Sequence, residues 1–183
     1  VLFTGFHMGD THACVSNLRY GPDGWIYATI GYSGFAGQVG GERHEFAQGL
    51  LRFLPDGSKL EFLQHTTNNT WGLGFTEEFD IVGSTANGNP SWFFTFPDAL
   101  RQAFGMQTAA VPRADDNPLF FPMSMDIRQV DQFDRYTAGA GHALYTARRF
   151  PAAWQNKIAF VCEPTGKLVG QFEMQREGAD FRA

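Results

Sequence analysis

The sequence has no long hydrophobic run. No apolar stretch approaches the roughly 20 residues that a membrane-spanning helix requires. No basic and apolar leader with a small-residue cleavage site precedes Val1. We therefore expect no membrane span in this chain. Because strand-like residues begin at once at Val1, we also expect the chain to be a segment of a larger protein.

Basic residues are few. Lys and Arg total 14 against 19 Asp and Glu, which gives a formal net charge of -5. Proteins that bind nucleic acids neutralise the phosphate backbone with cationic side chains. The charge therefore argues against DNA or RNA as a partner.

Cysteine is scarce, with Cys14 and Cys162 as the two examples. The sequence contains no CxxC pair, no haem attachment signature and no zinc spacing, so we expect no haem site in this chain. Cysteine is among the most buried residue types, which predicts two buried thiols in strands. A disulfide is the alternative if the protein is exported.

Glycine and phenylalanine are abundant, with 21 Gly and 19 Phe in 183 residues. Aromatic residues favour strands, and glycines favour tight turns. A hydrophobic content of 43% is ample for a core. The composition predicts an all-β fold.

One sequence stretch occurs twice. LRYGPDGWIYATIGY at residues 18–32 recurs without a gap 55 positions later as LGFTEEFDIVGSTAN at residues 73–87. Each copy contains two strand-like runs around a turn, which in the first copy is Gly21-Pro22-Asp23-Gly24. A hairpin repeated at a period of about 40 to 60 residues is typical of a β-propeller blade.

The strand pattern divides residues 1–183 into about three four-stranded blades, at residues 15–67, 68–135 and 136–183. The expected strands are 15–20, 25–30, 49–54 and 59–65, then 70–75, 79–85, 91–96 and 126–130, then 142–146, 157–162, 168–175 and 180–182. Residues 31–41 are expected to form a flexible loop. Residues 97–122 are expected to form a long insertion with a short helix that Asp98 caps. A six-bladed propeller needs roughly 250 residues or more, so this chain would cover about half of one.

Polar residues that precede the first strand of each blade should converge, because these strands line the central channel of a propeller. These residues are Asp10 and His12, Asn68 and Asn69, and His142. Their side chains can bind a metal ion or a carbonyl group, or transfer a proton. Glu163 follows a second strand and is the candidate metal ligand at the channel rim. Three structural alternatives stay open, namely a turn cap at the two asparagines, a core position for His142 and a surface loop for His12.

The run DTHACVSNLRYGPDGWIYATIGYSG at residues 10–34 resembles the soluble quinoprotein sugar dehydrogenases, the glucose and sorbosone dehydrogenases. Five further segments are similar to motifs of the large membrane-bound dehydrogenases of planctomycetes. They are NNTWGLGF at residues 68–75, GSTAN at 83–87, RQVD at 128–131, AGHALYTARRFP at 140–151 and FVCEPTGKLV at 160–169. In that group a propeller precedes helical repeats and a c-type haem domain. The resemblance covers nearly the whole chain.

This resemblance implies a six-bladed propeller that uses pyrroloquinoline quinone and calcium. It implies that His12 is the general base and that Asn69 lies next to the cofactor. The basic pair of that family falls on Thr165 and Gly166 in this chain, and we assign the nearest cation, Lys167, to the cofactor. We assign Asn68 and His142 to the same cofactor site. The expected partners are a sugar or alcohol substrate and the remaining blades and haem domain of the parent protein, in an exported, periplasmic or membrane-associated location.

The sequence thus favours an exported sugar or alcohol dehydrogenase that passes electrons to a haem domain elsewhere in the parent chain. One alternative is a non-catalytic propeller that binds carbohydrate or protein through exposed aromatic residues such as Trp92 and Phe94. A second is a calcium-dependent lactonase-like hydrolase whose calcium would be bound by Asn68, Asn69 and Glu163.

Overall fold

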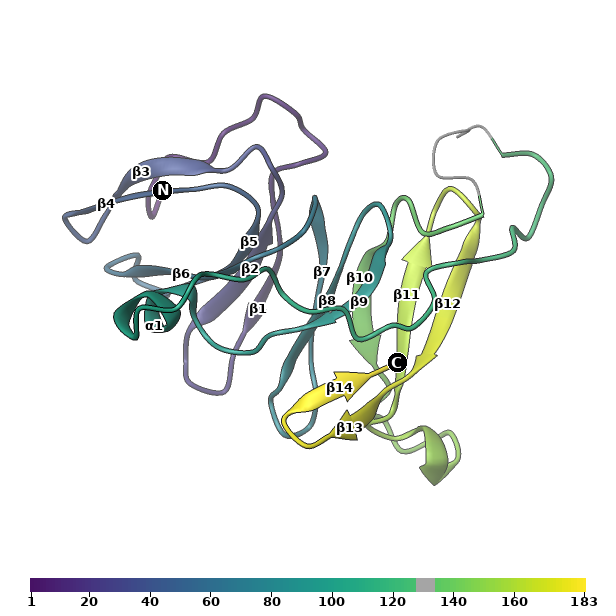
Figure 1. The fold of residues 1–183 in the computed structure, drawn as a ribbon. Coiled ribbons are helices and arrows are strands. Elements are labelled where there is room, and N and C mark those ends of the chain that lie inside the picture. The colour runs from purple at the N-terminus through teal and green to yellow at the C-terminus, as the bar shows by residue number, and fades with distance from the viewer. Residues whose placement is uncertain (128–133) are drawn as a thin grey trace. The chain divides into compact units, whose positions relative to one another are not determined.

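The computed structural model describes residues 1–127 and 134–183 (Figure 1). These residues form two compact units, each described separately. Unit 1 comprises Val1–Thr70 and Phe96–Val111, and unit 2 comprises Trp71–Thr95 and Pro112–Ala183. Antiparallel strands dominate both units, so the predicted all-β class is confirmed. In the described ranges, no helix has the length and apolar character that crossing a membrane requires.

Unit 1 contains a four-stranded antiparallel sheet with the strand order β1-β2-β5-β6. Its strands are β1 (Val15–Tyr20), β2 (Ile26–Ile30), β5 (Gly49–Phe53) and β6 (Leu60–His65). The four strands expected in the first blade are therefore confirmed to within a residue at their ends. The radial arrangement of blades that defines a propeller stays a prediction.

The prediction of a flexible loop after β2 is wrong. A hairpin of β3 (Phe35–Val39) and β4 (Glu42–Phe46) occupies this part of the chain. Gly40 and Gly41 have positive φ at its turn, which glycine adopts without steric cost. Phe35 stacks on Phe46 with ring centroids 5.1 Å apart, and this packing orders the hairpin.

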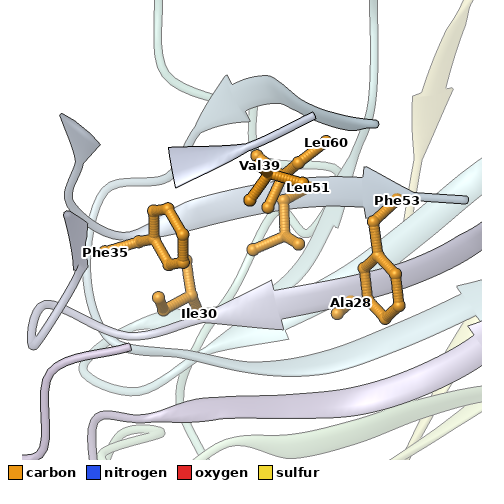
Figure 2. Packing of buried hydrophobic residues seen from close by; sticks show 7 residues of the cluster. All are labelled: Ala28, Ile30, Phe35, Val39, Leu51, Phe53 and Leu60. Atoms are coloured by element: carbon orange, nitrogen blue, oxygen red, sulfur yellow. The ribbon is translucent and has the colours of Figure 1, made fainter. Parts of the chain in front are cut away.

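The core of unit 1 lies where this hairpin packs on the sheet (Figure 2). Its buried members are Ala28, Ile30, Phe35, Val39, Leu51, Phe53 and Leu60, each at most 4% exposed. Burying a large apolar side chain contributes about 1.5 to 3 kcal/mol. The hairpin is thus part of the core rather than an appendage.

The predicted short helix of the insertion is present as α1 (Asp98–Ala103), but its predicted cap is wrong. The N-cap residue is Pro97, and no side chain caps the helix. Asp98 instead accepts a hydrogen bond from the backbone N–H of His65 at 3.1 Å, and its Oδ2 lies 2.8 Å from the Nδ1 of the same histidine. The carboxylate therefore fastens the insertion to the end of β6.

Unit 2 contains a sheet β7-β8-β9, a sheet β10-β11-β12 and a hairpin β13-β14. The strands are β7 (Thr70–Phe75, whose first residue belongs to unit 1), β8 (Ile81–Thr85), β9 (Asn89–Phe93), β10 (Ala140–Leu144), β11 (Ile158–Glu163), β12 (Leu168–Glu173), β13 (Gln175–Glu177) and β14 (Asp180–Arg182). The 3-10 helix η1 (Ala152–Trp154) lies between β10 and β11.

Two predictions for these sheets need correction. Of the strand expected at 126–130, Asp126 and Ile127 lie outside any strand, and residues 128–130 lie outside the described residues. The strand expected at 180–182 exists as β14, but it pairs with β13 rather than with β12. The chain leaves the extended sheet at Met174, so the last sheet has three described strands instead of four.

The repeated sequence forms a repeated structure. Adding 55 to the bounds of β1 and β2 gives the bounds of β7 and β8, since 15, 20, 26 and 30 become 70, 75, 81 and 85. The turn repeats as well. Gly21 donates its N–H to the carbonyl of Trp25 at 2.8 Å, and Thr76 donates to Asp80 at 3.0 Å.

One residue of the second turn adopts a conformation that its side chain disfavours. Gly24 has φ of 81°, and Phe79, which is 55 positions later, has φ of 68°. A residue with a Cβ atom pays a steric penalty in this left-handed region. The second copy keeps the turn although Phe79 stands where the first copy has Gly24.

Candidate functional site

The loops that enter β1 and β7 meet in unit 1. Asn69 donates a hydrogen bond from Nδ2 to the carbonyl oxygen of His12 at 2.8 Å, a contact named the tether below. The two residues are 57 positions apart in sequence. The structure therefore brings together two of the residues that the sequence proposed for the site.

The His12 imidazole is exposed beside a carboxylate. Its side chain is 90% exposed, and Nδ1 lies 3.6 Å from Oδ1 of Asp10. The same Oδ1 accepts the backbone N–H of His12 at 2.8 Å. The Tyr32 hydroxyl donates to the other oxygen of Asp10. The hydrogen bond from Tyr32, and after it that from the His12 N–H, hold the pKa of the Asp10 carboxyl below its ordinary value.

The Asn69 side chain is held in place, but within the described ranges only part of its hydrogen-bonding capacity is used. Its side chain is buried, and among the described residues Oδ1 has no hydrogen-bond partner. A Cβ atom added at Gly31 would come within 1.9 Å of this oxygen and 2.7 Å of the Ala13 Cα. Glycine at position 31 is thus required for the close approach that the tether needs.

Asn68 makes hydrogen bonds within its own loop. Its Oδ1 accepts the backbone N–H of Asn69 at 2.6 Å. Its carbonyl oxygen accepts the hydroxyls of Thr66 and Thr70 at 2.9 and 3.2 Å. These contacts are those of a turn cap, the structural alternative stated for this residue. Its assignment to a cofactor stays a prediction.

His142 lies in the core of unit 2. The side chain is fully buried, and its Nε2 is 3.0 Å from the Ser91 hydroxyl. In the part of the chain that the structure describes, Nδ1 has no partner. Burial lowers the pKa of His142 to about 3, so the ring is neutral near neutral pH. These features match the core alternative, and the assignment of His142 to a cofactor stays a prediction.

The Glu163 carboxylate is also fully buried in unit 2. One oxygen accepts the backbone N–H groups of Thr137 and Ala138 at 2.9 and 3.0 Å, and the other accepts that of Thr165 at 2.9 Å. Both oxygens are therefore engaged in fixing a loop. Among the described residues, no group of three or more His, Cys, Asp or Glu side chains is arranged to hold a metal ion. The metal role of Glu163 stays a prediction without structural support.

Lys167 lies at the exposed surface of unit 2. Its Nζ is 3.1 Å from Oδ2 of Asp126, so the cation already has an anionic partner. The structure places His12, Asn68 and Asn69 in unit 1 and His142, Glu163 and Lys167 in unit 2. It joins the residues of the first group through the tether and the adjoining turn.

Two further sequence expectations are wrong. Trp92 is fully buried, so it offers no surface on which a sugar could stack. Cys162 is exposed and Cys14 is half-buried, and both thiols are free, so the prediction of two buried thiols fails. Cys162 faces out because the strand β11 alternates, with Val161 and Glu163 directed inward.

Sequence reasoning missed Tyr32 and Ser33. The Ser33 hydroxyl donates to the Asp10 carbonyl at 3.0 Å and accepts the Asp10 N–H at 3.3 Å. Both residues lie two and three positions after the end of β2, at the same end of the hairpin as the start of β1. That shared end was the available signal, since a hairpin brings the residues flanking its open end together.

The fold and the site define a class of protein: an all-β chain with a repeated hairpin and a polar loop cluster at the open end of the first copy. The chain belongs to the family described as a domain of unknown function, DUF7133, whose model matches residues 1–183. The comparisons with curated proteins and with solved structures gave no match.

Proposed function

We propose that this chain is part of an exported propeller-type dehydrogenase that oxidises a hydroxyl group of a sugar or alcohol, with His12 as the general base. The observation that carries the proposal is the tether, which joins the loops before the two copies of the hairpin at the backbone carbonyl of His12, whose imidazole is exposed. Loops on a rigid scaffold are where binding and catalytic residues concentrate. Imidazole is a competent base near neutral pH.

The propeller architecture is itself part of the proposal. Its support is the four-stranded order β1-β2-β5-β6, together with the second hairpin at 55 residues' distance. Sequential antiparallel strands in repeated sheets are the elements from which propellers are built. The remaining blades and the haem domain are proposed to belong to the parent protein.

The described site residues do not fit the quinone that the sequence resemblance implies. Pyrroloquinoline quinone carries three carboxylates, which cationic side chains would have to neutralise. The Asp10 carboxylate lies beside His12, and Lys167 is paired with Asp126. The chemistry proposed for this chain is therefore limited to binding the substrate hydroxyl and removing its proton. We assign the electron acceptor to other parts of the parent protein.

Dye reduction by the full-length protein tests this proposal. Sugars and alcohols would be supplied with an artificial electron acceptor, with and without added quinone and calcium. His12→Ala should lower turnover at least about 100-fold, the usual contribution of a general base. His44→Ala changes a histidine on β4, away from the loop cluster, and should leave turnover unchanged. Absence of dye reduction under every condition would refute the dehydrogenase, and equal turnover of the two variants would remove His12 from the mechanism.

A further inference from the structure

We infer that Asp10 is the positioning residue for His12. The Asp10 carboxylate selects the imidazole tautomer of His12 that has hydrogen on Nδ1, and so directs the lone pair of Nε2 toward the substrate hydroxyl. The catalytic consequence rests on the proposed function, whereas the tautomer rests on the geometry of the loop alone. The inference adds a second residue to the site and gives it a separate role.

The geometry places one carboxylate against one ring nitrogen. The Asp10 Oδ1 lies 3.6 Å from Nδ1 of His12, which is the distance of an ion pair rather than of a hydrogen bond. The ring is 90% exposed, so a small rotation can bring Nδ1 within hydrogen-bond reach. Catalytic hydrogen bonds are commonly long in the ligand-free state and shorten when the substrate binds.

The carboxylate is fixed from the opposite side. Tyr32 donates its hydroxyl to Oδ2, which leaves Oδ1 directed toward His12. The Ser33 hydroxyl bonds to both the N–H and the carbonyl group of Asp10. Asp10 therefore has its orientation before any substrate arrives, as a residue that positions another should.

Elementary hydrogen bonding then decides the tautomer. An ionised carboxylate only accepts, so the nitrogen that faces it must carry the hydrogen. The other nitrogen, Nε2, keeps its lone pair. When the substrate O–H bond breaks, its electron pair stays on the substrate oxygen and its proton forms an N–H bond at Nε2. The Asp10 charge stabilises the resulting imidazolium.

Nuclear magnetic resonance of the full-length protein, labelled at histidine with ¹⁵N and ¹³C, measures the tautomer directly. Spectra would be recorded at a pH where the rings are neutral. We expect the His12 ring of the unsubstituted protein to carry its hydrogen on Nδ1. Asp10→Asn should shift the population toward the Nε2–H form, because an amide no longer demands a donor. A His12 ring with hydrogen on Nε2 in the unsubstituted protein, or the same tautomer in both proteins, would overturn the inference.

His7 provides the internal control for loop structure. Its Nδ1 is 3.1 Å from the carbonyl oxygen of Ser33, which only accepts, so its neutral ring must also carry hydrogen on Nδ1. This signature should persist in Asp10→Asn, and its loss would reveal that the substitution had disturbed the loop. In that case Tyr32→Phe supplies the decision, because it keeps the carboxylate, the His12 N–H bond to Oδ1 and the Ser33 bonds to the Asp10 backbone. It should therefore keep the Nδ1–H tautomer of His12. Loss of that tautomer with the His7 signature intact would contradict selection by the carboxylate.

Kinetics separates this inference from the proposed function. Asp10→Asn should lower kcat at least about tenfold with KM changed less than about twofold, because positioning acts on proton removal rather than on binding. Failure of the unsubstituted protein to oxidise any hydroxyl would refute the proposed function and leave the tautomer experiment decisive for Asp10. An unchanged kcat in Asp10→Asn, in an active protein, would refute the positioning role even if the dehydrogenase were real.

Discussion

The buried histidine of unit 2 predicts how the stability of the chain depends on pH. His142 is fully enclosed, and its pKa falls from the ordinary 6.5 to about 3 because burial penalises the charged ring. In the unfolded chain the same ring takes up a proton as the pH drops through about 6.5. The neutral native ring does not, so acid favours unfolding.

The sign and size follow from linkage. A histidine whose native pKa is depressed contributes stability that is complete above its unfolded pKa and is lost as the pH falls toward the native value. A difference of between 3 and 4 pH units corresponds to at most roughly 5 kcal/mol, at 1.36 kcal/mol per unit. That is comparable with the total stability of about 5 to 15 kcal/mol of many domains. The window runs from pH 6.5 down to about 3.

Asp115 opposes this trend. It accepts the N–H of Ser91, next to the histidine, and burial raises its pKa above the ordinary 3.8. A carboxyl group whose pKa is higher in the native state than in the unfolded state stabilises the fold as the pH falls through that native pKa. Its effect is the same in any variant that changes only His142, so a comparison of variants cancels it.

Urea unfolding of the chain and of His142→Gln at a series of pH values is the assay. Glutamine is neutral at every pH and can still bond to Ser91. Trp92 is fully buried in unit 2, so tryptophan fluorescence will follow its exposure. We expect the unsubstituted chain to lose several kcal/mol more than His142→Gln between pH 7 and pH 4, at 1.36 kcal/mol per unit of pKa difference. Parallel pH profiles would refute the claim that this ring stays neutral in the core.

Three further predictions concern other features. Gly31→Ala should break the tether and destabilise the chain by about 1 to 3 kcal/mol through overpacking, whereas Gly9→Ala, where a Cβ meets nothing within 4 Å, should be nearly neutral in thermal unfolding. Phe79→Gly should stabilise by about 1 kcal/mol because it relieves positive φ, while the same change at Phe104, whose φ is -94°, should not. Glu163→Gln should cost about 1 to 3 kcal/mol in chelator-containing buffer, since the carboxylate accepts three backbone N–H groups.

The strands of the first sheet were predictable because turn chemistry and strand alternation agree there. The turn at residues 21–24 lies between two β-rich runs, and the sheet β1-β2-β5-β6 follows the predicted order. The hairpin β3-β4 was not predictable in the same way. Its glycines read as flexibility, whereas Phe35 and Phe46 order the segment through packing with residues distant in sequence.

The candidate site was predictable only in part. The convergence of His12 and Asn69 followed from the expectation that loops before first strands meet, and the tether agrees with it. The role of Asp98 could not be predicted from the sequence, because its partner His65 is 33 residues away. The local pattern indicates a helix cap, whereas the carboxylate binds His65 instead. Glu163 likewise has a carboxylate whose three donors are backbone groups, which leave no pattern in the side chains.

The unpaired buried atoms allow one last distinction between the proposed site residues. Asn69 and His142 each bury one polar atom without a described partner, and each such atom costs about 1 to 3 kcal/mol. His142 bears this cost inside a closed core, where its hydrogen bond with Ser91 accounts for its presence. Asn69 bears it beside the exposed His12, and requires a glycine at position 31 to do so. A functional position is expected to bear such an energetic cost beside an exposed side chain, with a second residue, here Gly31, making room for it. By this criterion Asn69 is a stronger candidate than His142 to act together with His12.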